Sequence, residues 1–159
     1  CLLVDRRGSM GGKPLATAAM AAAAIAMRNP ASYSVVVFGK DVVAVKHQGA
    51  DKSSEQVVTD VLSMRGHGTT EISGALQAAC QQLDRSRAVR KITVLLSDCR
   101  ATVDGDVSTA AAALSEIVVV APEHDCEEAF RFANECNARI ATVSGPSQIV
   151  DSLAAVLER

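Results

Sequence analysis

The residues of this chain best suited to chemistry are oxygen donors in three separate polar segments. Asp5 and Asp98 each end an apolar run, and Ser9 and Thr70 lie in Gly-containing segments. Carboxylates and neutral hydroxyls are hard ligands, which suit Mg²⁺ or Mn²⁺ better than zinc. Taken one at a time, such residues also cap helices or bond to loop backbone. Together they predict a divalent-cation site, provided that the fold brings the three segments to one place.

The two aspartates are positioned by short apolar runs that predict buried strands. Residues 1–4 read CLLV before Asp5, and residues 91–97 read KITVLLS before Asp98. Unbroken apolar runs of this length are typical of parallel sheets covered by helices on both faces. Open α/β sheets bind ligands at the carboxyl ends of their strands. Three loops should therefore meet at that edge: 5–13, 65–70 and 98–106.

The remaining elements alternate between strand and helix patterns. The expected strands are 1–5, 33–38, 41–45, 91–97, 116–121 and 139–143. The expected helices are 15–27 (with Pro14 in the first turn), 51–64, 71–83, 107–114, 123–137 and 146–158. The short link Gly39-Lys40 makes strand 41–45 antiparallel to the strand before it. Residues 15–27 are almost wholly apolar, so we expect this helix to be buried on every side against the centre of the sheet.

This alternation predicts an α/β fold with a doubly wound, mostly parallel sheet of six strands. Helices should cover both faces, and the third strand should be an antiparallel edge strand. A chain of 159 residues suits a single domain spanning 1–159. Because the chain begins directly in a core strand, we expect this domain to be cut from a longer protein.

Composition excludes several classes of function. A net charge of −2 gives no electrostatic reason to expect binding to nucleic acid or to an anionic membrane. No apolar run approaches the roughly 20 residues that a membrane span needs. The five cysteines are odd in number and widely spaced, which favours reduced thiols in the cytoplasm over a disulfide framework.

The three loop motifs resemble the metal-ion-dependent adhesion site of von Willebrand factor A domains. That family has Asp-x-Ser-x-Ser after the first strand, a Thr in a Gly-rich loop, and an Asp after the fourth strand. The corresponding segments here are DRRGS at 5–9, GTTEI at 68–72 and LLSDCR at 95–100. The likeness covers essentially the whole chain and implies the strand order 3-2-1-4-5-6. It also implies a set of metal ligands: Asp5, Ser9, Thr70 and Asp98.

The resemblance implies a binding module and not an enzyme. In such domains a partner's acidic side chain completes the coordination of the metal at the top face. The segment LLSDCRA at 95–101 is similar to bacterial members, such as the magnesium-chelatase subunit and the proteins that work beside MoxR-type AAA+ ATPases. We therefore expect a cytoplasmic protein that binds a protein partner, with such an ATPase or its complex as a candidate. The loop residues expected to contact the partner are His67, Thr69, Cys99 and Arg100.

Arg7 departs from the family pattern, because it stands where the first motif serine should be. A guanidinium is permanently charged and offers only hydrogen-bond donors, so it cannot ligate a cation. At ~5 Å from a divalent ion, with an effective dielectric of ~20, the repulsion is roughly 6 to 7 kcal/mol. Millimolar binding is worth only about 4 kcal/mol. An inward Arg7 would empty the site and pair with Asp5 or Asp98, whereas an outward Arg7 would leave a weakened site.

We expect weak or absent Mg²⁺ or Mn²⁺ binding, with Arg7 hydrogen-bonded to at least one of the two carboxylates. The alternative function is a metal-independent interaction domain in which Arg7 replaces the metal and receives a partner's carboxylate. A third reading, a hydrolase that uses Cys99 activated by Arg100, has the least support. Cys99 also stands where the family has a glycine, which restricts the backbone of that loop.

Overall fold

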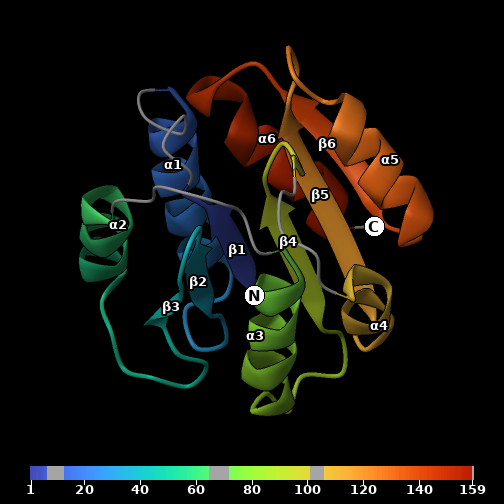
Figure 1. Cartoon of the computed structure of the whole chain (residues 1–159). Coiled ribbons are helices and arrows are strands. Elements are labelled where there is room, and N and C mark those ends of the chain that lie inside the picture. The colour runs from blue at the N-terminus through green and yellow to red at the C-terminus, as the bar shows by residue number, and fades with distance from the viewer. Residues whose placement is uncertain (7–12, 65–71, 101–105, 159) are drawn as a thin grey trace.

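The computed structural model describes residues 1–6, 13–64, 72–100 and 106–158, and it contains one six-stranded sheet between two layers of helices (Figure 1). The strands are β1 (Leu2–Asp5), β2 (Val35–Phe38), β3 (Val42–Lys46), β4 (Ile92–Leu96), β5 (Glu116–Pro122) and β6 (Arg139–Val143). Their order is β3-β2-β1-β4-β5-β6. β3 is antiparallel to β2, and the other neighbouring strands are parallel. The predicted fold class and strand order are confirmed.

Six helices cover the two faces of this sheet. They are α1 (Lys13–Arg28), α2 (Ser54–Ser63), α3 (Ile72–Asp84), α4 (Val107–Ala112), α5 (Glu127–Glu135) and α6 (Pro146–Leu157). One buried cluster joins α1, α2 and α6 to one face, and a second cluster joins α3, α4 and α5 to the other. In Figure 1, α3 stands in front of the sheet and α6 behind it. Element boundaries differ from the predicted ones by a few residues, most at α5, which begins at Glu127 and not near 123.

The alternation of side chains along the strands explains the two clusters. In β1, Leu2 and Val4 face the α1 side, whereas Leu3 faces the α3 side. Successive side chains in a strand point to opposite faces, so a strand buried on both sides must be apolar throughout. All four residues of β1 are buried, Asp5 included. The central strand therefore holds this carboxylate inside the protein.

One expectation about α1 is wrong. Its inward residues pack against the sheet as predicted, but Met20 is 42% and Met27 is 82% exposed. α1 lies centrally on its face of the sheet, with α2 and α6 as its neighbours. A single helix layer on each face leaves the outer side of that layer in solvent whatever its composition. The apolar sequence of α1 therefore predicted its packing against the sheet, but it did not predict the exposure of its outer side.

Arginines secure the end of α6 against the sheet. Arg90 donates two hydrogen bonds to the carboxylate of Glu116 and one to the carbonyl of Leu157. Arg139 donates to the Val156 carbonyl at 2.7 Å and to Glu116 at 3.2 Å. Cations at a helix C-terminus satisfy its last carbonyls and interact favourably with the helix dipole. The amino ends of β4, β5 and β6 thus hold α6 in register with the core.

Candidate functional site at the carboxyl end of the sheet

Asp5 and Asp98 lie at the carboxyl ends of adjacent strands, as the sequence predicts. β1 pairs in parallel with β4, with Val4 opposite Leu96. Asp5 ends β1, and Asp98 follows β4 after one further residue. Both side chains are buried, at 1% and 6% exposure. The fold therefore brings two acidic groups to the edge at which the parallel strands end, the upper edge in Figure 1, which we call the top edge.

Ser97 connects the two strand ends. Its hydroxyl donates to Asp5 Oδ2 at 2.7 Å and accepts from the backbone N–H of Cys99 at 2.9 Å. Asp98 Oδ1 accepts from the backbone N–H of Arg100 at 3.0 Å. These donors are neutral, so they orient the carboxylates and do not remove their charge. Sequence reasoning missed Ser97, although a hydroxyl at the end of a buried strand beside a carboxylate is a signal for it.

Arg6 was also missed, and it links β1 to the end of α2. Its backbone N–H donates to Phe38 at 2.7 Å, and its side chain is buried. The guanidinium donates to the Met64 carbonyl from Nε at 2.9 Å and also from Nη2. Burial lowers the pKa of Arg6, and the nearby charge of Asp5 opposes that shift. Met64 immediately precedes residues 65–71, so Arg6 links the end of β1 to the start of the predicted loop that contains Thr70.

Cys99 is buried in an unusual backbone conformation. Its φ is +60° and its side chain is 5% exposed. Left-handed φ is uncommon for a residue with a Cβ. Burial, reinforced by the charge of Asp98, raises the pKa of this thiol to about 12. The thiol is therefore protonated at neutral pH, which argues against a nucleophile, and its burial keeps it from the partner contact that we expected.

Arg100 lies at the rim of the same edge and is exposed. Its guanidinium binds both carboxylate oxygens of Asp125, with Nε–Oδ2 at 3.0 Å and Nη2–Oδ1 at 2.6 Å. This pair joins the segment after β4 to the segment after β5. A partner carboxylate that used Arg100 would have to compete with Asp125. The sequence did not predict that Asp125 pairs with Arg100, since this pairing depends on two strands separated by a helix.

Five of the predicted site residues lie outside the described residues. These are Arg7, Ser9, His67, Thr69 and Thr70. Among the residues that the structure describes, no three His, Cys, Asp or Glu side chains gather in a group that could hold a metal. A cation site built on Asp5 and Asp98 would therefore take its other predicted ligands, Ser9 and Thr70, from outside the described residues.

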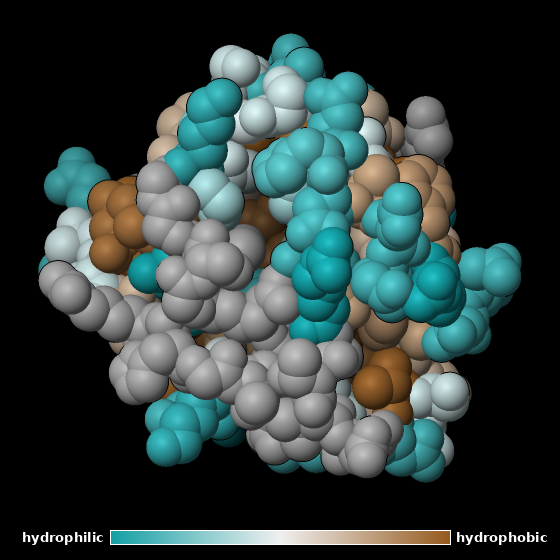
Figure 2. Space-filling view, turned by 45° about the horizontal axis from the view of Figure 1, so that its top comes forward, coloured by the Kyte–Doolittle hydropathy of each residue, from teal (hydrophilic) through white to brown (hydrophobic). Residues whose placement is uncertain are grey.

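Part of the surface near this edge is hydrophilic. Figure 2, in which the top of Figure 1 comes forward, shows a band of teal side chains to the right of the centre, with brown side chains in scattered places. A small cavity of about 60 Å³ opens beside the edge, lined in part by Ser97, Lys13 and His124. It is too small for most organic ligands.

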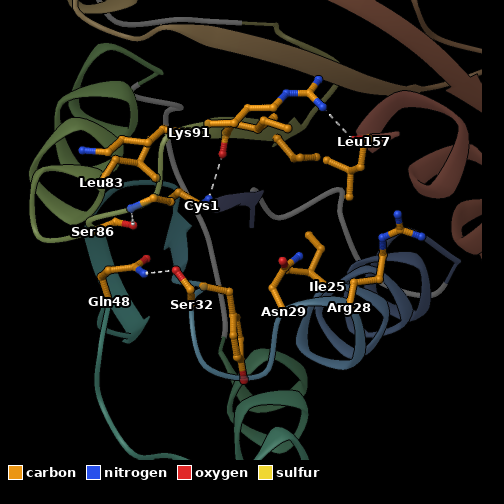
Figure 3. Close-up of a pocket in the computed structure, with 15 residues that line it drawn as sticks. Cys1, Ile25, Arg28, Asn29, Ser32, Gln48, Leu83, Ser86, Lys91 and Leu157 are labelled. Carbon is orange, nitrogen blue, oxygen red and sulfur yellow. Dashed lines mark hydrogen bonds between the residues drawn. The ribbon is translucent and has the colours of Figure 1, made fainter. Parts of the chain in front are cut away.

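A larger cavity of about 450 Å³ lies at the opposite end of the sheet, between the ends of α1 and α6 (Figure 3). Among the described residues, its wall includes Arg28, Arg90 and Lys91 and no acidic residue. Arg28 pairs with Glu158, however, and Arg90 pairs with Glu116, both just outside the wall. These pairs offset most of the charge that would select an anion. The wall also includes Cys1, the first residue of the chain.

Comparisons with known proteins agree with this architecture. A family model described as "VWA domain containing CoxE-like protein" matches residues 1–123. No curated protein sequence matches the chain. A von Willebrand factor type A protein from Catenulispora acidiphila has a similar structure, with a TM-score of 0.75 and 16% identity over 98% of this chain. The present chain spans only 40% of that protein.

Two further similar structures contain metal. Manganese-loaded TRAP protein from Plasmodium vivax gives a TM-score of 0.70 with 16% identity, covering 96% of this chain and 70% of that one. Proximal thread matrix protein 1 from the mussel byssus, with a zinc-occupied MIDAS motif, gives 0.67 with 15% identity, covering 98% and 46%. At such low identity these likenesses establish the fold alone.

Proposed function

Because this chain belongs to the family of VWA domain containing CoxE-like proteins, we propose that it is a protein-recognition module whose binding site is the top edge of the sheet. The observation that carries the proposal is the pair of buried acids at the ends of two adjacent strands, connected through Ser97. Rigid strands hold these acids at the edge where the predicted loops begin, which is how folds commonly present binding groups. We propose no catalytic role, because the Cys99 thiol is buried with a raised pKa.

Asp5 and Asp98 would hold a divalent cation together with Ser9 and Thr70. Their carboxylates are hard oxygen ligands that lie at one edge of the sheet, so the described part of the site suits a hard cation. A bound Mg²⁺ or Mn²⁺ would offer an open position for a partner's carboxylate. Ser97 would keep Asp5 oriented for this role, since its hydroxyl bond fixes one carboxylate oxygen.

The metal-independent alternative rests on Arg7, two residues after Asp5. Its guanidinium can place a positive charge beside the two buried acids, and Arg binds carboxylates with two parallel hydrogen bonds. In that case Arg7 pairs with Asp5 or Asp98 and receives the partner's carboxylate in place of the metal. We expect this state in the isolated domain, with weak or absent binding of divalent metal.

Titration calorimetry with Mg²⁺ and Mn²⁺ separates the two modes. Arg7→Ser restores the missing hydroxyl and removes the competing charge, so it should bind metal at least about ten-fold more tightly than the wild type. Arg87→Ser is a matched control at an exposed arginine far along the chain and should change nothing. Equal affinity of wild type and Arg7→Ser would show that Arg7 points to solvent and would reject the metal-independent mode.

The partner that we propose to test is a MoxR-type AAA+ ATPase from the same organism, in the cytoplasm. Five unpaired cysteines suit a reducing compartment. No helix in the described ranges has the length and apolar character of a membrane span. Thr70→Ala should weaken ATPase capture by the purified chain, whereas Thr59→Ala, on the exposed side of α2, should not. Equal capture by both variants would place the interaction elsewhere on the surface.

A further inference from the structure

The outer side of α1 is apolar along its whole length. Ala16, Met20, Ala23 and Met27 follow one another at spacings of four, three and four residues, which places them in one stripe of the helix. Met20 is 42% and Met27 is 82% exposed, and both alanines are partly exposed. Between Lys13 and Arg28 the helix contains no charged residue at all. A solvent-facing helix side usually carries polar residues, so this stripe needs a separate explanation.

The helices on either side of α1 carry only negative charge. α2 contains Glu55 and Asp60, α6 contains Asp151, and neither helix contains a basic residue. Asp60 is paired with Lys52, but Glu55 and Asp151 are exposed and form no ion pair within the described part of the chain. Leu62 in α2 and Val150 in α6 are also exposed, at 46% and 42%. The apolar stripe thus lies between two acidic helices.

This charge pattern selects among three candidate occupants. An anionic membrane is disfavoured, because membrane-surface helices carry Lys and Arg beside their apolar face. A second copy of the chain is disfavoured, because a two-fold interface centred on α1 would bring acidic helices against acidic helices in either orientation. A partner with basic residues beside an apolar stripe meets neither objection.

We propose that the outer face of α1 is a docking site for an amphipathic helix of a partner protein, with an apolar stripe flanked by Lys and Arg. α1 has 16 residues and is about 24 Å long, enough for four to five turns of a facing helix. Ala16 and Ala23 let a facing helix approach closely, and Met20 and Met27 adapt to its side chains. The stripe contains none of the residues proposed to bind the metal or the partner at the top edge, so this inference does not depend on that metal or partner.

The test uses the 159-residue chain as bait for a phage-displayed library of amphipathic helices of about 18 residues. Stripe positions are drawn from Ala, Leu, Met and Ile, and flanking positions from Lys, Glu, Gln and Ser. Wild type should enrich Lys over Glu at the flanking positions by about ten-fold or more. Met20→Lys/Met27→Lys should lose the selected binders by at least about ten-fold, because two charges then enter the apolar stripe.

Matched variants keep the test specific. Gln77→Lys/Gln81→Lys adds the same two charges to exposed positions of α3, on the opposite face, and should leave binding unchanged. Glu55→Lys/Asp151→Lys should reverse the preference, so that Glu is enriched at the flanking positions. Lys is as good a helix former as Met or Gln, so the helices should stay intact.

Three results would overturn the proposal. Equal enrichment of Lys and Glu would remove the argument from charge. Binders that survive Met20→Lys/Met27→Lys would use another surface. A concentration-dependent dimer in sedimentation velocity that these two substitutions abolish would make a second copy the occupant.

Discussion

α1 and α3 occupy equivalent places on the two faces of the sheet, yet their outer sides differ completely. Both helices bury a row of apolar residues against the strands, including Ile25 in α1 and Leu76 in α3. The outward residues of α3 are Gln77, Gln81 and Asp84, all exposed and polar. In α1 the corresponding side carries alanine and methionine. The fold thus explains the inner sides of both helices but only the outer side of α3, which points to a role for the outer side of α1 beyond folding.

Truncation of an inward side chain should lower the free energy of unfolding most, and by similar amounts in α1 and α3. Leu76 is fully buried and Ile25 is 6% exposed. Leu76→Ala and Ile25→Ala should each lower the free energy of unfolding by about 2–5 kcal/mol, through lost burial and residual cavities. Urea denaturation measures this difference. Met20→Ala and Gln77→Ala are the outward controls, and each should stay within about 0.5 kcal/mol of wild type.

One result of these measurements would contradict the difference between the outer sides of α1 and α3. If Met20→Ala destabilises the isolated chain as much as Ile25→Ala does, then the outer side of α1 contributes to the core, and its composition needs no partner.

A smaller effect should follow from loosening α2, the neighbour of α1. Arg6 holds the Met64 carbonyl at the end of α2 with two hydrogen bonds from its buried guanidinium. Arg6→Met should cost about 1.5–3 kcal/mol of stability, because it removes charge-assisted bonds and leaves a carbonyl without its donor. α3 has no such link to β1 in the described residues. Amide hydrogen exchange in this variant should become faster in α2 and stay unchanged in α3. An equal increase of the exchange rates in both helices would contradict this prediction.

The two inner sides should also differ in their response to alkaline pH. The α3 side of the core contains the Cys99 thiol, whose pKa is raised to about 12 by burial first and by Asp98 second. The inward residues of α1 carry no ionisable group, and Tyr33, which is buried on the α1 side and also has its pKa raised by burial, begins to lose its proton in the unfolded chain only near pH 10. The unfolded chain releases the thiol proton near pH 8.5 and the folded chain only near 12. The contribution of the protonated thiol to the free energy of unfolding is therefore complete below pH 8.5 and is lost as pH rises toward 12.

The slope from this one group should reach at most about 1.4 kcal/mol per pH unit. Cys99→Ala should flatten the alkaline limb of stability against pH, measured by urea titration between pH 8 and pH 10. Cys80→Ala, at a partly exposed position of α3, is the control and should leave the limb unchanged. An identical limb in Cys99→Ala would mean that other groups dominate the alkaline loss.

The smallest effect concerns the outer stripe alone. Limiting hydrogen peroxide should oxidise Met27 faster than Met20, in line with exposures of 82% and 42%. Peptide mass spectrometry gives the two rates, and they should become equal in denaturant. A docked helix should protect both residues. Equal rates in the folded chain would show that exposure along α1 is more uniform than the structure has it.

Most of the fold could be predicted from the sequence because its signals are local. Unbroken apolar runs before Asp5 and Asp98 marked the central strands, and the short Gly39-Lys40 link marked the antiparallel hairpin. Both acids were therefore placed at the correct edge. Ser97, Arg6 and Asp125 were not assigned their contacts, since each bonds to a residue far away in the chain or on another strand. No pattern in the sequence encodes such distances.

The sequence by itself determined the layers and the edge at which the two acids lie, because hydrophobic period and strand length depend only on neighbouring residues. The strand order followed from the resemblance of the three loop motifs to von Willebrand factor A domains. The tertiary structure alone decided which sides of the helices meet solvent. An apolar stripe on a helix can be buried when a further layer packs over it, or exposed when the helix forms the outermost layer. Only the number of layers in the fold decides between these two outcomes. It also decided the left-handed backbone of Cys99 and the hydrogen bonding of Arg6 to the Met64 carbonyl. Both arise where separate segments converge, and there packing and hydrogen bonding outweigh the preferences of any single residue.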